Sequence, residues 1–266
     1  MDPMLNIATR AARAAGDVIM RSLGRVDPHK ISPKGRNDFV SEVDRHAERE
    51  ILYILQKAYP GHGFLAEEAG RLGTRNEEFV WVIDPLDGTT NFLHGFPMFA
   101  VSIGLLHRGR LEAGVIYDPV RQELFTAKRG GGATLENRRI RVAQQTVLAG
   151  ALLGTGLPFK DQSFNDAYFG MLRELMKDTA GIRRAGSAAL DLAYVAAGRL
   201  DGFWEIGLQP WDMAAGVLMI QEAGGIVSEL GGGDRFLDSG NVVAANPRLH
   251  QAMLDVIAPH RTENLR

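Results

Sequence analysis

Two aspartates spaced three residues apart, Asp84 and Asp87, follow an apolar run at residues 79–83. The run is rich in β-branched and aromatic side chains and too short for an ordinary helix, so we expect a buried strand that ends at Asp84-Pro85. Asp-Gly at positions 87 and 88 is typical of a turn, and an ordinary turn is the alternative interpretation. Two carboxylates this close repel each other unless a cation lies between them, and such oxygen ligands suit a hard divalent ion.

Further carboxylates along the chain favour the metal interpretation. Glu67 and Glu68 follow a short apolar segment at residues 63–66, where we expect another strand end. Asp212 follows Trp211 in the first turn of an expected alanine-rich helix, where a carboxylate also meets the positive end of the helix dipole. Acids at several predicted element ends indicate one shared site.

Together these segments resemble the inositol monophosphatase family. The resemblance is carried by Glu67-Glu68, by residues 81–92 (Trp-Val-Ile-Asp-Pro-Leu-Asp-Gly-Thr-Thr-Asn-Phe) and by residues 211–216 (Trp-Asp-Met-Ala-Ala-Gly). It extends from the first predicted helix to about Leu254, and residues 186–194 are most similar to the bacterial SuhB type of inositol-1-monophosphatase. The resemblance implies an α/β (α+β) fold, a layered αβαβα sandwich like that of fructose-1,6-bisphosphatase.

The same resemblance implies a magnesium-dependent, lithium-sensitive hydrolase of myo-inositol 1-phosphate and related monophosphates. A metal-activated water would attack phosphorus in line, with two or three Mg²⁺ ions per site. The implied metal ligands are Glu67, Asp84, the backbone carbonyl of Leu86, Asp87 and Asp212. Glu67, Thr89 and Asp44 would be catalytic, the last two by drawing a proton from the water. For Asp44 the alternative is an acid that only complements a helix dipole.

The resemblance also implies contacts to the substrate, at Asp87, Gly88, Thr89, Arg183, Gly186, Ser187, Ala188, Glu205 and Asp212. For Glu205 the alternative is a solvated charge at a strand end. Lys34, in a polar loop at residues 28–37, is a further candidate, whereas for His94 we favour a loop or packing role. Gln209 stands where animal members carry histidine, so 3'-phosphoadenosine 5'-phosphate, a sugar bisphosphate and histidinol phosphate stay alternative substrates.

Aspartyl-phosphate chemistry is excluded by spacing. Enzymes of that class use a nucleophilic aspartate with a second aspartate two residues further on, whereas Asp84 and Asp87 are three apart with a proline between them. Gly130-Gly131-Gly132 suggests a phosphate loop, but no Lys-Ser/Thr pair follows, so we expect a tight turn.

Composition agrees with an ordinary globular protein. The 266 residues are 45% hydrophobic and 23% charged, which allows a single domain of residues 1–266 built from two closely packed halves, about 1–149 and 150–266. The net charge of −2 predicts no general attraction to nucleic acid or to an anionic membrane. The absence of cysteine, of a signal-like apolar segment and of a long apolar run favours the cytoplasm.

Partners are implied only by the resemblance. A homodimer is the expectation for the family. SuhB-type proteins are also linked to bacterial transcription, so a contact with RNA polymerase or an elongation factor is an alternative or additional function.

Hydrophobic periodicity predicts the remaining elements. We expect helices over residues 3–22 and from about 43 to 58, and antiparallel strands at 98–106, 111–117 and 123–127. In the second half we expect strands at 151–155, 203–206, 226–228 and 242–245, and helices at 165–177, 187–197, from 211 and after Pro247. Blocks of helix and sheet that alternate in this way predict a layered sandwich.

Overall fold

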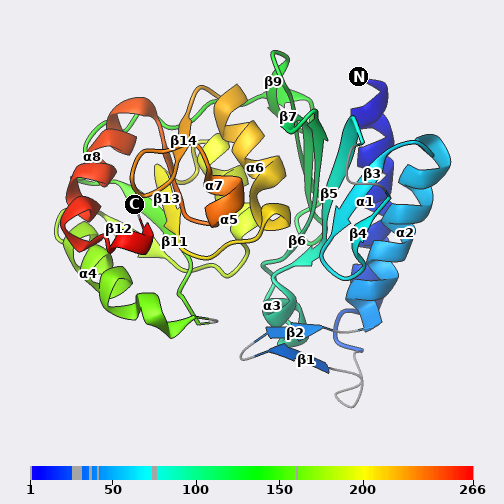
Figure 1. Ribbon diagram of the computed structural model, residues 1–266, viewed down its shortest axis with the longest axis horizontal. Helices are drawn as coiled ribbons and strands as arrows, with labels where there is room; N and C mark the ends of the chain where they lie inside the picture. Colours follow the sequence, from blue (N-terminus) through cyan, green and yellow to red (C-terminus); the bar gives the residue numbers. More distant parts are fainter. Residues whose placement is uncertain are drawn as a thin grey trace.

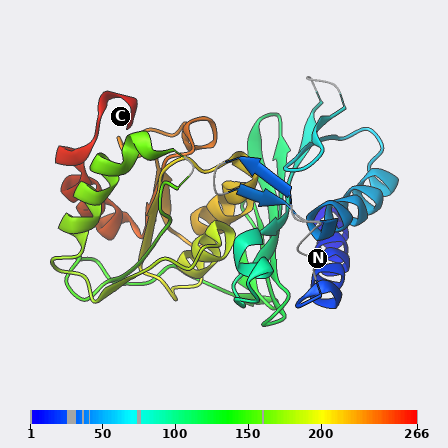
Figure 2. The ribbon, with the colours of Figure 1, turned by 90° about the horizontal axis from the view of Figure 1, so that it is seen from below.

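The chain folds into five alternating layers of helices and sheets (Figures 1 and 2). The computed structural model describes residues 2–25, 32–35, 38–40, 42–73, 77–159 and 161–265. A pair of helices, an eight-stranded sheet, a second pair of helices, a five-stranded sheet and a last pair of helices follow one another. The predicted αβαβα sandwich is therefore confirmed.

The first layer consists of α1 (Pro3–Ser22) and α2 (Glu42–Ala58). The carboxylate of Asp2 caps α1 by accepting from the N–H of Met4 at 2.9 Å. Alanine, leucine and isoleucine recur at helical spacing along both helices, and this face is buried against the large sheet. The predicted helix at residues 3–22 is thus confirmed with the same bounds.

The large sheet has the strand order β10-β9-β8-β7-β6-β5-β3-β4. Its strands are β3 (Gly63–Ala66), β4 (Gly70–Leu72), β5 (Phe79–Asp87), β6 (Ala100–His107), β7 (Arg110–Asp118), β8 (Glu123–Lys128), β9 (Gly132–Leu135) and β10 (Arg138–Arg139). Strands β6 to β8 form the predicted antiparallel meander, which the structure extends to β5 on one side and to β9 and β10 on the other, and β3 lies parallel to β5. The three glycines at 130–132 form the turn into β9, as predicted.

Strand β5 does not end where the sequence indicated. It continues through Pro85 to Asp87 and pairs with β6 at Asp84 opposite Ser102 and at Asp87 opposite Ala100. Two residues of β5 therefore face one residue of β6, which is a β-bulge. Proline is tolerated at a bulge because the ladder is interrupted there, so the predicted stop at Asp84-Pro85 is wrong.

The middle layer consists of α5 (Ala188–Ala196) and α6 (Pro210–Glu222). Gly104 and Gly114 let α6 lie close to the large sheet, because a Cβ on Gly104 would come 2.8 Å from Ala214 Cβ and one on Gly114 would come 3.0 Å from the Ala215 backbone. The opposite sides of α5 and α6 pack against the smaller sheet. This central layer therefore joins the two sheets.

The smaller sheet has the order β12-β11-β13-β15-β14 and mixes parallel and antiparallel pairs. Its strands are β11 (Leu152–Thr155), β12 (Gly181–Arg183), β13 (Gly202–Glu205), β14 (Ile226–Ser228) and β15 (Val242–Ala245). Helices α4 (Asn165–Leu175) and α8 (Pro247–Ile257) cover its outer face. All of these elements are predicted from periodicity within a few residues, except β12, which the sequence analysis missed.

Shorter elements complete the described chain. They are the β1–β2 hairpin (Ser32–Gly35 and Asp38–Val40), α3 (Thr89–Leu93), α7 (Phe236–Ser239) and the 3₁₀ turns Gln162–Phe164, Ala258–His260 and Glu263–Leu265. The side chain of Lys34 lies outside the described part of the structure, so its candidate role stays a prediction. The division into halves also stays a prediction.

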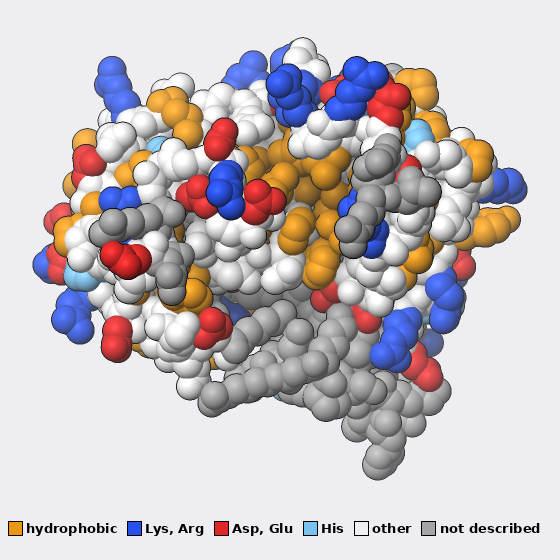
Figure 3. Space-filling view, in the orientation of Figure 1, with side chains coloured by type: hydrophobic (Ala, Val, Ile, Leu, Met, Phe, Trp, Pro, Cys, Tyr) orange, Lys and Arg blue, Asp and Glu red, His pale blue; other side chains and the backbone are white. Residues whose placement is uncertain are grey.

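Charges of both signs are spread over the face shown in Figure 3, and apolar side chains are visible near its middle, beside the central helices. This mixture fits the net charge of −2. Among the described helices, none combines the length and the apolarity that a membrane span requires.

Candidate metal centre and active site

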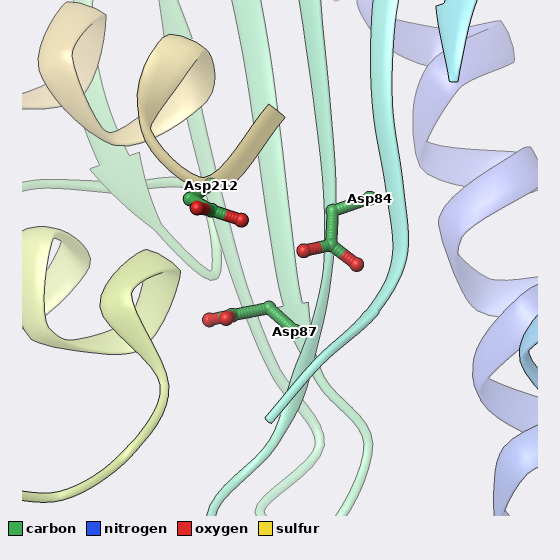
Figure 4. A group of neighbouring side chains, drawn as sticks. All are labelled: Asp84, Asp87 and Asp212. Atoms are coloured by element: carbon green, nitrogen blue, oxygen red, sulfur yellow. The ribbon is translucent and has the colours of Figure 1, made fainter. Parts of the chain in front are cut away.

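The bulge in β5 turns two carboxylates toward the same space. Side chains three positions apart on a regular strand point to opposite faces of the sheet, because the period is two. The extra residue between Asp84 and Asp87 removes this opposition, and both carboxylates point toward the central helices (Figure 4). The N–H of Leu86 donates to Asp84 Oδ1 at 2.9 Å, which fixes the first of the two side chains.

Asp212 on α6 completes a cluster of three acids. One carboxylate oxygen from each of Asp84, Asp87 and Asp212 lies within 4.8 Å of the others. Asp212 occupies the first turn of α6 and accepts a hydrogen bond from the N–H of Gln209 at 2.7 Å. The oxygen of Asp87 that faces α5 accepts from the Ser187 hydroxyl at 2.5 Å and from the N–H of Ala189 at 2.8 Å. Two helices and one strand therefore hold the cluster.

Glu67 lies on the loop after β3 and lines the same cavity as the three aspartates. This loop is anchored by Glu48 of α2, whose carboxylate accepts from the N–H groups of Glu68 at 2.8 Å and Ala69 at 2.9 Å. Glu48 is 3% exposed. The sequence analysis missed this anchor, because only the fold brings residue 48 next to residue 68.

Asp44 and Thr89 meet as the resemblance implies. The Thr89 hydroxyl lies 2.8 Å from Asp44 Oδ1 and 3.0 Å from the carbonyl oxygen of Leu86. Both neighbours accept hydrogen bonds, so the single hydroxyl proton points to one of them or is shared. Asp44 is fully buried in the first turn of α2, which argues against the alternative of a solvated acid at a helix start.

Electrostatic repulsion is the dominant property of the cluster. Burial, followed by the charges of Glu67, Asp87 and Asp212, raises the pKa of Asp84 well above its usual value. Burial also raises the pKa of Asp87 to about 6, although the bonds from Ser187 and Ala189 favour its charged form. A cation among these acids would reverse both shifts.

The cluster opens into a cavity of about 550 Å³ between the two sheets. All of the predicted metal ligands, catalytic residues and substrate contacts line this cavity except two. Asp44 lies behind Thr89, and Arg183 lines a separate hollow beside Phe96 and Arg121. The neighbouring Arg184 lines the main cavity instead.

The cavity wall opposite the bulge is formed by the second half of the chain. Glu205 at the end of β13 lies against Gly156, where a Cβ would come 1.8 Å from Glu205 Oε1. The amide of Asn91, on α3, donates to the carbonyl oxygens of Met98 at 2.7 Å and Ala185 at 2.9 Å, which ties the short helix after the bulge to the loop before α5. The sequence analysis did not single out Asn91 or Gly156.

Comparison with known proteins identifies the family. A sequence model of the inositol monophosphatase family matches residues 1–265. The chain belongs to the inositol monophosphatase family. A relative in Pseudomonas aeruginosa, named Nus factor SuhB, is 55% identical over 270 residues and is covered completely, as is the present chain.

Solved structures of inositol monophosphatase family members agree with this assignment. The crystal structure of the extragenic suppressor protein SuhB from Bartonella henselae is 46% identical and superposes with a TM-score of 0.93, over 96% of this chain and 98% of the other. The inositol monophosphatase from Anabaena is 41% identical with a TM-score of 0.87, over 96% and 95%. The resemblance stated from the sequence is therefore confirmed.

The donor set fits the magnesium ions that inositol monophosphatases generally use. Asp84, Asp87 and Asp212 offer carboxylate oxygens, Glu67 lines the same cavity, and the carbonyl oxygen of Leu86 lies beside Thr89. Such hard oxygen ligands suit magnesium, and the described chain places no histidine or thiol in the cluster that would favour a softer metal.

Proposed function

We propose that this protein is a magnesium-dependent phosphatase that hydrolyses myo-inositol 1-phosphate and related phosphate monoesters. The observation that supports this most directly is the convergence of Asp84, Asp87 and Asp212 within 4.8 Å at a cavity that also holds Glu67 and Thr89. A phosphate monoester repels nucleophiles through its own charge, so its hydrolysis needs cations at the phosphate and an acceptor for the proton of the attacking water.

When bound by Glu67, Asp84, Leu86, Asp87 and Asp212, two or three magnesium ions would supply charge neutralisation and Lewis-acid activation. Thr89 and Asp44 would move the proton. A water attacks phosphorus in line and passes a proton to Thr89 Oγ1, while the hydroxyl proton of Thr89 passes to Asp44 Oδ1, 2.8 Å away. The bond between phosphorus and the leaving oxygen breaks, the leaving oxygen takes a proton from solvent water and departs as the alcohol, and Asp44 returns its proton to solvent.

The cavity walls would orient the rest of the substrate. Gly88 has a φ of 95°, and a Cβ there would come 2.9 Å from the carbonyl oxygen of Met98, so only glycine fits this turn beside the phosphate position. Gly88 and Thr89 would contact the phosphate. The loop at Gly186, Ser187 and Ala188, together with Glu205, would contact the alcohol, whereas Arg183 faces a different hollow.

The decisive experiment measures phosphate release from a panel of monophosphates with and without Mg²⁺. The panel contains myo-inositol 1-phosphate, 3'-phosphoadenosine 5'-phosphate, a sugar bisphosphate and histidinol phosphate. We expect release that requires Mg²⁺, is fastest with myo-inositol 1-phosphate and is inhibited by Li⁺. Release from none of these compounds at saturating Mg²⁺ would contradict the proposal, and faster release from another compound would reassign the substrate.

A second candidate function is binding to the transcription machinery. It is supported by the name Nus factor SuhB given to the Pseudomonas aeruginosa relative. The partner would be RNA polymerase or an elongation factor. The homodimer expected for the family is one form in which the protein would bind this partner. Co-purification of RNA polymerase with the wild-type protein and with Asp87→Asn tests this function. Equal recovery would show binding independent of catalysis, and no recovery from either would argue against it.

A further inference from the structure

One carboxyl group of the cavity, that of Asp191, is not accounted for by the metal centre. Asp191 lies in the first turn of α5, is 2% exposed and lines the cavity. Its Oδ1 has no hydrogen-bond partner among the described residues. It also does not belong to the group of three aspartates whose oxygens converge within 4.8 Å. A buried polar atom without a partner lowers stability, so its position calls for another explanation.

Two glycines, Gly154 in β11 and Gly156 just after it, have no side chain that would fill the space beside the carboxyl groups of Asp191 and Glu205. A Cβ on Gly154 would come 3.5 Å from Asp191 Oδ1, and a Cβ on Gly156 would come 1.8 Å from Glu205 Oε1. Asp191 on α5 and Glu205 on β13 therefore both lie against the same short segment of backbone. Both carboxyls line the same cavity as the metal centre.

The two acids also interact electrostatically. Burial raises the pKa of Glu205, and the charge of Asp191 is the next cause. Burial also raises the pKa of Asp191, and the negative charge of Asp87 is the next cause. The positive charge of Arg184 partly opposes the rise in both pKa values. A hydrogen-bond donor placed between the two carboxyls would satisfy the free oxygen and reduce their repulsion.

We propose that Asp191 is a specificity-determining residue that, together with Glu205, binds a hydrogen-bond donor on the leaving alcohol. The inference rests on the phosphatase function proposed above. The donor is a hydroxyl or an ammonium group, since both satisfy a carboxyl oxygen. Alcohols that carry such a group would be accepted in the cavity, and an alcohol without one would leave Asp191 unsatisfied. A site with a buried unpaired polar group rejects ligands that cannot pair with it.

A purely structural role for Asp191 predicts a different result. A structural acid stabilises the fold through its hydrogen bonds, whereas Oδ1 of Asp191 makes none within the described chain. Replacement by asparagine keeps the shape and removes the buried charge. We therefore expect Asp191→Asn to unfold at the same temperature as the wild type or higher, while its discrimination between substrates decreases. Binding residues often trade stability for function in this way.

The test compares kcat/KM for three substrates in Asp191→Asn, in Asp191→Ala and in the control Asp255→Asn, which lies on the exposed side of α8. myo-Inositol 1-phosphate offers hydroxyl donors, histidinol phosphate offers an ammonium group, and the leaving group of p-nitrophenyl phosphate offers no donor. We expect Asp191→Ala to lower the ratio of either donor-bearing substrate to p-nitrophenyl phosphate about 10-fold or more. Asparagine keeps an acceptor oxygen but no charge, so Asp191→Asn should affect histidinol phosphate most.

Two outcomes separate this inference from the phosphatase proposal. The specificity role is wrong if the wild type hydrolyses these substrates and Asp191→Ala changes neither kcat/KM ratio by more than about twofold. It is also wrong if Asp191→Asn unfolds at a clearly lower temperature than the wild type. If the wild type hydrolyses none of these substrates, the phosphatase proposal fails. Calorimetric titration with histidinol and with myo-inositol then tests the proposed subsite on its own. Binding that Asp191→Ala weakens about tenfold would still support the subsite, and unchanged or absent binding would exclude it.

Discussion

At the scale of single residues, the site depends on carboxylates whose charge is unfavourable unless a cation is present. Asp87 has a pKa of about 6 because of burial, and two hydrogen bonds from Ser187 and Ala189 hold its other oxygen in place. Asp84 is nine-tenths or more buried and is surrounded by three further acids. Such an arrangement costs stability in the free protein, so its physical explanation lies in the ions that it would bind.

Replacing Asp87 by asparagine should abolish most turnover and leave the fold intact. Asparagine can still accept from Ser187 and Ala189, but it loses the charge that holds a cation. We expect kcat/KM for myo-inositol 1-phosphate to fall more than about 100-fold, since even partners of metal ligands typically contribute 10- to 100-fold. Steady-state phosphate release at saturating Mg²⁺ measures this, with Asp255→Asn as the control. Substantial activity in Asp87→Asn would refute the ligand assignment.

The Thr89 hydroxyl can be tested by an isosteric change. Thr89→Val removes the hydroxyl that lies 2.8 Å from Asp44 Oδ1 and 3.0 Å from the carbonyl oxygen of Leu86, and keeps the shape of the side chain. We expect kcat to fall about 100-fold or more with little change in KM, which is the range for loss of an acid–base group. Thr89→Ser restores a hydroxyl and should recover most of the rate. Equal loss in both variants would indicate a packing role instead.

At the scale of elements, the distance between α6 and the large sheet decides where Asp212 lies. On β7, Gly114 faces the backbone of Ala215, and a Cβ would approach Ala215 Cα and O at 3.0 Å. On β6, the hydroxyl of Ser102 donates to the carbonyl oxygen of Trp211 at 3.1 Å, which fixes the start of α6 against the bulge. Asp212 therefore reaches Asp84 and Asp87 only if the helix keeps this close approach.

Gly114→Ala should consequently weaken the metal centre from a distance. The added methyl group meets backbone atoms that cannot rotate away, so α6 must shift, and we expect a loss of about 1–3 kcal/mol in the free energy of unfolding. The Mg²⁺ concentration for half-maximal activity should rise with it. Denaturant unfolding and a Mg²⁺ titration measure the two effects. Gly61→Ala serves as the control, because a Cβ at Gly61 has no atom within 4 Å. If Gly61→Ala raises the Mg²⁺ concentration for half-maximal activity as much as Gly114→Ala does, the argument from close approach is wrong.

The sequence predicts the separate elements and the acids better than it predicts their junctions. Periodicity finds β3 and β15 with their observed bounds, because an apolar strand is a local signal. The bulge at Pro85 is missed, since proline at the end of an apolar run usually ends a strand and only pairing with β6 shows the extra residue. The contacts of Glu48 with the Glu67 loop and of Asn91 with Ala185 are also missed, because they join segments far apart in the chain.

At the scale of the whole molecule, the central layer makes stability and metal binding interdependent. The acids of the site come from β5, α5, α6 and β13, which belong to both sheets and to the helices between them. Repulsion among these acids therefore acts across the sandwich and not within one element. A ligand that binds only the folded state stabilises it, so cations at this site should stabilise the entire fold.

The pH dependence of unfolding tests this coupling. Asp87 has a pKa of about 6 in the folded state, above its ordinary value of 3.8, so between these pH values the folded state holds a proton that the unfolded state releases. Its contribution to stability is fully present below about pH 4 and is lost as pH rises through about 6, by at most about 3 kcal/mol. Half-buried His62 and buried His250 have pKa values lowered by desolvation and act in the opposite direction, so the relevant quantity is the difference in stability between the wild type and Asp87→Asn.

Without divalent ions, the stability of the wild type relative to Asp87→Asn should therefore fall between pH 4.5 and pH 7, since asparagine does not titrate. Addition of Mg²⁺ at pH 7 should stabilise the wild type strongly and Asp87→Asn weakly, because the cation favours the charged carboxylates. Chemical unfolding at a series of pH values, in chelator and in Mg²⁺, measures both differences. If the two proteins show parallel pH profiles and equal stabilisation by Mg²⁺, the acids of the central layer do not bind the ion together.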